Sequence, residues 1–302
     1  MKYKSLINAT FRLSEIGLGC ASYWGKKQFS EKQAHAVVHQ AIASGINYFD
    51  TGHSYSEGNA ERRLGRALAN QATRDLIISS KVGTRVGRLG KLYKDFSANW
   101  IKQSCELSLQ QLQVDHLPLF FLHGPNPENF NHETYQTLDQ LKAAGKIGMV
   151  GVNTFDDHII DLSVASEQFE CLMLDYNIFT QHRLATIKHL TGKKMDVIVA
   201  GGLGGGLFQQ GFNRVTNMKK LWYWLRAFKN NRQQMIKAKE FGFLNQQQQA
   251  SAIQIALAYV LQAKEISSTL VGTTSHLHLR ELVQASDLTL SPKLIEKIQA
   301  LA

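Results

Sequence analysis

Short apolar runs alternate with longer amphipathic stretches along almost the whole sequence, and this alternation limits the fold more than any other feature. The runs are rich in Ile, Val, Leu and Phe, as in strands that are buried on both faces of a parallel sheet. The stretches between them are typical of helices, and Gly45 and Gly145 follow two of them where helices usually end. The predicted strands comprise residues 16–20, 46–49, 76–80, 117–122, 147–152, 171–176, 195–200 and 268–272.

Eight strand–helix units predict a closed (β/α)8 TIM barrel that forms a single domain over residues 1–302. An open, doubly wound α/β sheet is the alternative for a strictly alternating chain. That fold usually has a glycine-rich turn after its first strand, whereas Gly17-Leu18-Gly19 lacks the third glycine and the later acidic residue. The barrel is therefore favoured. The clearest predicted helices comprise residues 31–44, 60–69, 97–113, 133–144 and 292–301.

Residues 208–245 exceed the minimal strand–helix pattern. Insertions in barrels occur in loops, so we expect this segment to follow the seventh strand and to lie over the catalytic mouth. It carries a cluster of basic residues among aromatic side chains, namely Arg214, Lys219, Lys220, Arg226, Lys229, Arg232, Lys237 and Lys239 with Trp222, Tyr223, Trp224 and Phe228. Nucleic acid can bind such a surface, but the near-helical spacing favours a solvated helix face, and no nucleic-acid partner is predicted.

The composition excludes several classes of protein. A net charge of +10 fits general solubility and some attraction for an anionic ligand. Cys20, Cys105 and Cys171 are odd in number and far apart, so neither a disulfide framework nor a metal site is predicted. The N-terminus lacks the apolar region of a signal peptide, and the apolar stretches are too short to span a bilayer. We therefore expect a cytoplasmic protein with no membrane partner, and a monomer as the default.

Four ionisable residues stand at or just past the ends of predicted strands. Asp50, Lys81 and His123 each follow one of these strands, and Tyr55 lies in the loop after the first of them. Each residue type alone is common as a helix cap, a strand terminus or a packed core residue. The C-terminal ends of the strands meet at one mouth of a barrel, so the four side chains should converge. Because such a group is costly to bury, its convergence predicts an active site.

The segment around Asp50 carries a specific resemblance. Phe49-Asp50-Thr51-Gly52-His53-Ser54-Tyr55, followed by Gly58, Glu61, Leu64-Gly65 and Ala67-Leu68, resembles the signature of the aldo-keto reductase superfamily. The likeness continues through Ser80-Lys81-Val82-Gly83, Leu122-His123-Gly124-Pro125, Gly145-Lys146-Ile147-Gly148, Gly151-Val152-Asn153 and Tyr176-Asn177. The resemblance covers nearly the whole chain. Within the superfamily, the sequence resembles the bacterial sugar and aldose dehydrogenase-like branches.

The resemblance implies a (β/α)8 barrel that binds NADPH at its C-terminal mouth and, without a metal, reduces an aldehyde or ketone or oxidises the corresponding alcohol or sugar. NADH is the alternative cofactor. Tyr55 would donate a proton to the alkoxide that forms when a carbonyl accepts hydride. Lys81 would stabilise the phenolate left behind, and Asp50 would keep Lys81 charged and oriented. His123 would orient or polarise the carbonyl.

The cofactor-binding residues follow from the same resemblance. A Ser-Asn pair and a Gln hold the nicotinamide carboxamide in the family, and here these positions read Asn153-Thr154 and Met173. Many members stack a tyrosine on the nicotinamide where this chain has Ala200, and Gly272 and His278 replace two cations that often bind the 2′-phosphate. The predicted set is Gly19, Cys20, Asp50, Asn153, Thr154, Met173, Leu203, Gly204, Gly205, Gly272, Thr273, Thr274, His278 and Glu281.

Loops would complete the site. Residues 201–206 are rich in glycine, which suits the close approach of a backbone to a pyrophosphate and a flexible hinge equally well. The substrate pocket would be built from Tyr23, Trp24, His53, Arg85 and residues 208–245. Their mixed aromatic and basic character suits a sugar, a small aldehyde or an anionic carbonyl compound.

Two other functions stay open at this point. Lys81 at a strand end could form a Schiff base, as in aldolase-type lyases, although a lysine paired with Asp50 is a poor nucleophile. A reductase-like barrel could also be retained as a nucleotide-binding sensor or interaction module. The departures at Met173, Ala200 and Gly272 motivate that second alternative.

Overall fold

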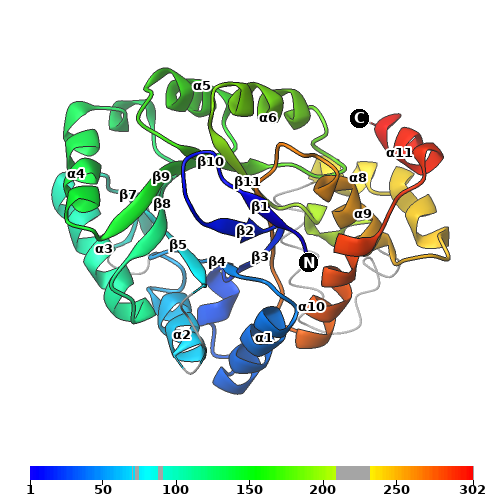
Figure 1. Cartoon of the computed structure of the whole chain (residues 1–302), viewed down its shortest axis with the longest axis horizontal. Coiled ribbons are helices and arrows are strands. Elements are labelled where there is room, and N and C mark those ends of the chain that lie inside the picture. The colour runs from blue at the N-terminus through cyan, green and yellow to red at the C-terminus, as the bar shows by residue number, and fades with distance from the viewer. Residues whose placement is uncertain (70, 72–74, 88–90, 209–231, 302) are drawn as a thin grey trace.

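The computed structural model describes the chain except residues 70, 72–74, 88–90, 209–231 and 302. A closed barrel of parallel strands occupies its centre, with the strand order β10-β11-β12-β3-β4-β5-β8-β9 (Figure 1). The barrel strands are β3 (Ile16–Gly19), β4 (Tyr48–Asp50), β5 (Ile77–Val82), β8 (Leu117–His123), β9 (Ile147–Asn153), β10 (Cys171–Asp175), β11 (Asp196–Ala200) and β12 (Ser268–Val271). The predicted (β/α)8 TIM barrel is confirmed, and each predicted strand matches an observed one to within two residues at either end.

Helices surround the barrel (Figure 1). They are α1 (Glu31–Ala43), α2 (Asn59–Leu68), α3 (Ala98–Leu112), α4 (His132–Ala143), α5 (Asp157–Ala165), α6 (Arg183–Gly192), α8 (Arg232–Lys237), α9 (Ala252–Leu261), α10 (His276–Val283) and α11 (Pro292–Gln299). Short polar side chains start several of them, and Ser30 forms a complete capping box with Gln33 ahead of α1. Gly45 and Gly145 follow α1 and α4 with left-handed backbone angles, as predicted.

Two apolar layers stabilise this arrangement. The larger one lies between the sheet and the helices, whereas a second cluster fills the barrel interior. A hairpin formed by β1 (Tyr3–Ser5) and β2 (Arg12–Ser14) adds Leu6 and Leu13 to that interior cluster. The backbone N–H of Ile7 donates to Asp196, the first residue of β11, so the hairpin closes the N-terminal end of the barrel. The C-terminal mouth is the open end.

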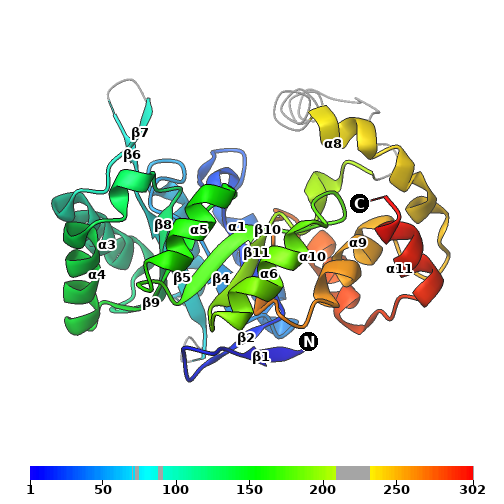
Figure 2. The ribbon, with the colours of Figure 1, turned by 90° about the horizontal axis from the view of Figure 1, so that it is seen from above.

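A second hairpin, formed by β6 (Thr84–Val86) and β7 (Leu92–Lys94), extends from the opposite end of the barrel (Figure 2). The sequence predicted neither hairpin, because strands of three mixed residues carry too little apolar pattern. Short 3-10 turns also occur, namely η1 (Ser22–Gly25), η3 (Pro127–Asn129), η4 (Gly204–Gly206), η5 (Glu240–Gln246) and η6 (Gln284–Asp287).

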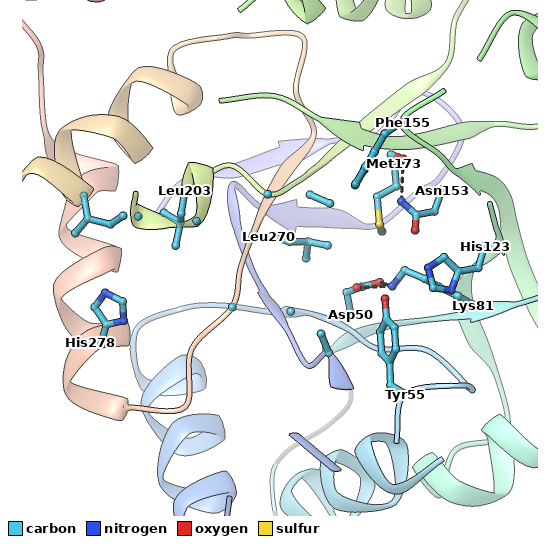
Figure 3. Close-up of a pocket in the computed structure, with 18 residues that line it drawn as sticks. Asp50, Tyr55, Lys81, His123, Asn153, Phe155, Met173, Leu203, Leu270 and His278 are labelled. Carbon is cyan, nitrogen blue, oxygen red and sulfur yellow. Dashed lines mark hydrogen bonds and ion pairs between the residues drawn. The ribbon is translucent and has the colours of Figure 1, made fainter. Parts of the chain in front are cut away.

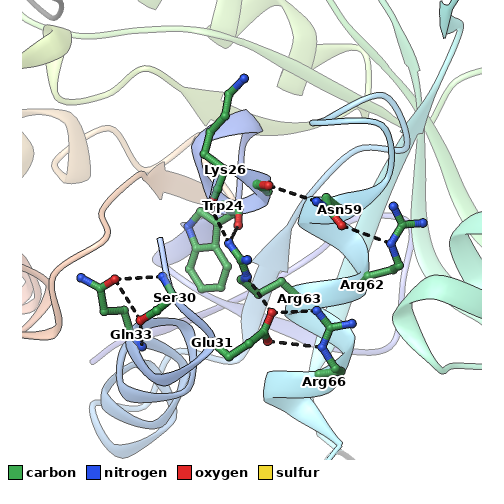
Figure 4. Close-up of polar contacts among 10 residues, drawn as sticks. Trp24, Lys26, Ser30, Glu31, Gln33, Asn59, Arg62, Arg63 and Arg66 are labelled. Atoms are coloured by element: carbon green, nitrogen blue, oxygen red, sulfur yellow. Dashed lines mark hydrogen bonds and ion pairs between the residues drawn. The ribbon is translucent and has the colours of Figure 1, made fainter. Parts of the chain in front are cut away.

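Charged side chains join the first two helices to the loop before them (Figure 4). Glu31 on α1 accepts hydrogen bonds from Arg63 and Arg66 on α2. Arg63 also donates to the backbone carbonyls of Trp24 and Lys26 in and next to η1. These bonds fix the loop that follows β3 at the barrel mouth.

The predicted insertion lies mostly outside the described residues, because residues 209–231 and most of the basic cluster fall there. Its described end consists of α8 and η5. Asn245 donates from its side chain to the carbonyl of Phe208 at 2.8 Å, and Phe241 packs edge-on against Phe179 at 5.2 Å. The position of the segment over the mouth stays a prediction. Among the described residues, each helix is too short or too polar to form a membrane span.

Candidate active site

A cavity of about 550 Å³ opens at the C-terminal ends of the barrel strands (Figure 3). It contains all four ionisable residues that the sequence singled out. Asp50 ends β4, Lys81 lies near the end of β5, His123 ends β8, and Tyr55 follows in the loop after β4. The described residues that line it are Gly19, Ala21, Asp50, Tyr55, Lys81, His123, Asn153, Phe155, Met173, Ala200, Gly201, Leu203, Gly205, Gly206, Ile253, Leu270, Gly272 and His278.

Lys81 and Asp50 form an ion pair at the floor of the cavity. The Lys81 Nζ donates to both carboxylate oxygens of Asp50, at 2.6 and 2.5 Å, and to the carbonyl of Thr51 at 2.7 Å. The Lys81 side chain is only 2% exposed. Burial by itself would lower the pKa of this lysine, but Asp50 and Tyr55 outweigh burial, and the pKa is raised. Lys81 is therefore a fixed positive charge.

The Tyr55 hydroxyl points toward this pair (Figure 3). The Lys81 Nζ lies 5.4 Å from the centre of the Tyr55 ring, and the ring meets the His123 imidazole edge-on at 5.7 Å. Burial raises the pKa of Tyr55, and the positive charge of Lys81 acts against that rise. The phenol is thus protonated at neutral pH and lies beside a cation that stabilises its ionised form.

His123 is neutral under the same conditions. Burial, Lys81 and Lys94 together lower the pKa of His123 to about 3. Lys94 also donates to the backbone carbonyl of His123, at 2.5 Å, which holds that cation next to the ring. A neutral imidazole can orient a bound group through a hydrogen bond, but it has no spare proton to give up as an acid near neutral pH.

Two of the three carboxamide positions line the cavity. The amide nitrogen of Asn153 donates to the carbonyl of Met173 at 3.0 Å, which leaves the amide oxygen of Asn153 for other partners. Met173, Ala200 and Leu270 all line the cavity and belong to or pack against the apolar cluster inside the barrel, so they give the cavity an apolar part. Thr154 is buried and does not line the cavity, and its hydroxyl accepts from the backbone N–H of Asp156.

The glycine-rich segment after β11 lies on the side of the cavity away from Asp50 and Tyr55, as the position of Leu203 shows (Figure 3). Gly201, Leu203, Gly205 and Gly206 line it, whereas Gly204 packs against the Phe179 ring. Gly201 and Gly204–Gly206 have positive φ angles, which an L side chain rarely adopts. At Gly201, Gly205 and Gly206 the backbone itself therefore borders the cavity, and Leu203 adds a side chain to the same wall.

Gly19, Gly272 and His278 also contribute to the lining, and His278 lies on the same side as Leu203, away from Tyr55 (Figure 3). Cys20, Thr274 and Glu281 do not line the cavity, and the Glu281 carboxylate accepts from Ser251 instead, at 2.7 Å. Thr273 is also absent from the lining, because its hydroxyl accepts from the backbone of Ser275 and contacts His278 Nδ1 at 3.2 Å. The cofactor roles of all these residues stay predictions.

Sequence reasoning missed several lining residues. Ala21 and Phe155 lie two residues after the ends of β3 and β9, so their place just past a barrel strand was a usable signal. Leu270 and Ile253 gave no such signal, since both are ordinary apolar residues within regular elements. His53 and Arg85, expected in the substrate pocket, line a separate cavity of about 500 Å³ beside Trp100.

Among the described residues, no group of three or more His, Cys, Asp or Glu side chains is placed so that it could hold a metal ion. The three cysteines are free and buried.

Comparison with known proteins agrees with this geometry. The model of the aldo/keto reductase family matches residues 15–302. An uncharacterized oxidoreductase of Bacillus subtilis, YqkF, is 27% identical over 294 residues, which cover 95% of this chain and 92% of that protein. An NADH-specific methylglyoxal reductase of Escherichia coli is 26% identical over 96% of this chain and 95% of its own length. The holo form of aldo-keto reductase AKR11C1 from Bacillus halodurans superposes with a TM-score of 0.83 at 25% identity, covering 100% of this chain and 96% of the other.

Proposed function

The chain belongs to the aldo/keto reductase family, and from that premise we propose that it reduces an aldehyde or ketone with a nicotinamide dinucleotide, using Tyr55 as the proton donor. The family consists of oxidoreductases that act on CH–OH groups with NAD(P). The observation that carries the proposal is the convergence of Tyr55 and His123 on the buried Lys81–Asp50 pair at the floor of one cavity.

The site chemistry follows from charge. When bound, the reduced nicotinamide supplies the hydride, and the carbonyl oxygen that receives the electron pair becomes basic. The Tyr55 hydroxyl is protonated and faces the cavity, whereas the Lys81 ammonium is bound to Asp50, so Tyr55 transfers its proton to that oxygen. The phenolate that remains is stabilised by the Lys81 ammonium, whose own charge Asp50 maintains. In the oxidising direction the same groups run in reverse.

His123 has a different part in this proposal. Its neutral imidazole lies edge-on to the Tyr55 ring, so both side chains address the same region of the cavity. A hydrogen bond from the imidazole to the carbonyl oxygen would place that oxygen next to the Tyr55 hydroxyl.

NADPH is the proposed cofactor, with NADH as the alternative. Asn153 supplies an amide oxygen for the carboxamide, and the glycine backbone of residues 201–206 suits a pyrophosphate. Arg280 on α10 and Thr274 are the groups left for a 2′-phosphate, since Thr273 bonds within its own loop. The replacement of two expected cations by Gly272 and His278 is the observation that favours NADH.

The same geometry bears on the two alternatives, a Schiff-base lyase and a nucleotide-binding barrel without turnover. Lys81 donates to Asp50 Oδ1, Asp50 Oδ2 and the Thr51 carbonyl, and its pKa is raised, so it stays an ammonium, which has no lone pair to attack a carbonyl carbon. This supports reduction over Schiff-base chemistry. A nucleotide-binding barrel without turnover would retain nucleotide affinity and lack activity on every carbonyl compound.

The test combines binding with turnover. The protein is titrated with NADPH and NADH by nucleotide fluorescence, and the tighter one is then supplied with a panel of aldehydes, ketones and sugars. We expect binding of at least one nucleotide and its oxidation by a carbonyl compound. Binding without oxidation on the whole panel would support the sensor, and failure to bind either nucleotide would refute the proposal. Cytoplasmic location and a monomeric state stay predictions.

A further inference from the structure

The Asp50 carboxylate has a second hydrogen-bond donor besides Lys81. The Ser79 hydroxyl donates to Asp50 Oδ1 at 2.7 Å, and the Tyr48 hydroxyl lies 2.9 Å from the Ser79 oxygen. A serine hydroxyl has a single proton, and here that proton is directed at Asp50. Tyr48 must therefore donate to Ser79. The result is a chain of hydrogen bonds from Tyr48 through Ser79 to the catalytic ion pair.

The strand register creates this chain. In the pairing of β4 with β5, Tyr48 stands opposite Ile77 and Asp50 stands opposite Ser79. Alternate residues of a strand share a face, so Tyr48 and Asp50 point into the barrel together, as do Ser79 and Lys81. Gly17 on β3 leaves the space for the Tyr48 ring, because a Cβ there would lie 2.7 Å from it.

The hydrogen-bonded hydroxyls of Tyr48 and Ser79 lie in apolar surroundings, where polar groups are unusual. Tyr48 and Ser79 are both 0% exposed, and Tyr48 belongs to the interior cluster with residues such as Leu119, Phe121 and Met149. A buried hydroxyl is costly unless it is paired, so two hydroxyls in this cluster call for an explanation other than packing. Their bond to Asp50 supplies one.

We propose that Ser79 and Tyr48 are positioning residues, which hold the Asp50 carboxylate against Lys81 and thereby set the acidity of Tyr55. This inference rests on the proposed function. Neither residue lines the cavity, so both act through Asp50 and not on the substrate.

The charges around Asp50 give the direction of the effect. The titratable groups that face it are Lys81 on β5, Tyr48 on β4, Tyr55 in the next loop and Cys20 after β3. Burial, and then Asp50, raise the pKa of Tyr48, so that phenol stays a donor. The negative charge of Asp50 also raises the pKa of Tyr55. The Ser79 hydroxyl offsets part of this charge, so its loss should make Tyr55 a weaker acid.

The test uses pH profiles of kcat in the reducing direction. For Ser79→Ala we expect kcat to fall by about tenfold. The alkaline limb of its pH profile should shift to higher pH, by at most about one unit, and the KM for nucleotide should be unchanged. Tyr48→Phe should change kcat and the alkaline limb in the same direction but by less. The double variant should have the same kcat and the same limb as Ser79→Ala alone. Ser79→Thr keeps the hydroxyl and should restore the profile. If Ser79→Ala does not fold, Tyr48→Phe still tests the chain, because it removes one oxygen only.

Matched controls and a second readout separate this inference from the proposed function. Ser163→Ala and Tyr259→Phe make the same changes at buried positions outside the site and should leave the profile unmoved. The Tyr55 phenol can also be titrated by absorbance without substrate, as the difference between each protein and its Tyr55→Phe counterpart. A higher Tyr55 pKa in Ser79→Ala supports the inference even if no substrate is found. The inference would be overturned if Ser79→Ala had a lower thermal stability but the same Tyr55 pKa and the same alkaline limb of the pH profile as the wild type.

Discussion

The Lys81 ammonium bridges both carboxylate oxygens of Asp50, with its nitrogen 2.6 Å from one and 2.5 Å from the other. The pair is nearly inaccessible to water, since the two side chains are 2% and 7% exposed. Removal of one partner would leave the other as an unpaired buried charge, which costs several kcal/mol. The same pair is the positive centre beside the Tyr55 ring, so a single interaction serves both the fold and the chemistry.

Met173 stands where a hydrogen-bonding side chain is expected, and its replacement by glutamine should restore the missing partner. We expect Met173→Gln to tighten nucleotide binding by about three- to tenfold, the value of one added hydrogen bond. Met173→Leu adds no polar group and should bind as the wild type does. Fluorescence titration measures both constants, and equal constants for the Gln and Leu variants would contradict the expectation.

The nucleotide preference should be weak. With Gly272 and His278 in place of two cations, we expect kcat/KM for NADPH and NADH to differ by less than about tenfold. A side chain fits at Gly272, because its nearest neighbour would be the Gly19 carbonyl at 3.9 Å. Gly272→Lys should therefore raise the preference for NADPH by about tenfold, while Gly272→Ala should not change it. A wild-type preference of a hundredfold would contradict this account.

His123 should make the fold sensitive to acid. The unfolded chain binds a proton at this histidine near pH 6.5, whereas the folded protein does so only near pH 3, so unfolding is accompanied by proton uptake between these values. The free energy of unfolding should fall as the pH is lowered through this window. His123→Asn cannot take up this proton and should show a flatter dependence in denaturant titrations at a series of pH values. Identical slopes for the two proteins would count against a neutral buried imidazole.

Gly17 should tolerate no side chain. A Cβ at this position would lie 2.7 Å from the Tyr48 ring and 3.0 Å from Leu270, inside the barrel. We expect Gly17→Ala to lower the free energy of unfolding by about 1–3 kcal/mol through overpacking. Gly192→Ala is the control, because nothing lies within 4 Å of the added carbon there. Equal stabilities of the two variants would show that the Tyr48 ring can move aside.

The fold could be predicted because its signal is repeated and local. Strands such as Ile147–Asn153 are free of polar side chains up to their last residue, and glycines or capping residues mark the ends of α1 and α4. The β1–β2 and β6–β7 hairpins could not be predicted, since their strands have three residues each and gain their stability from tertiary contacts. The Leu6 and Leu13 side chains, for example, are buried only because the barrel ends there.

The site was predictable to the extent that strand order determines it. Asp50, Lys81 and His123 converge because parallel strands end at one mouth. The bond from Ser79 to Asp50 depends on which residues stand opposite each other in two neighbouring strands, and that register cannot be read from either strand alone. The separation of His53 from the Tyr55 cavity likewise depends on loop geometry, although only two positions separate them in the sequence.

The most direct test of the central claim is single-turnover reduction of a carbonyl substrate by Tyr55→Phe and by wild type, each saturated with the reduced nucleotide. The account predicts that Tyr55→Phe binds nucleotide as wild type does and slows turnover by about a hundredfold or more, because its proton donor is absent. Turnover by Tyr55→Phe at a rate close to that of wild type would contradict it, and the proton would then come from another group.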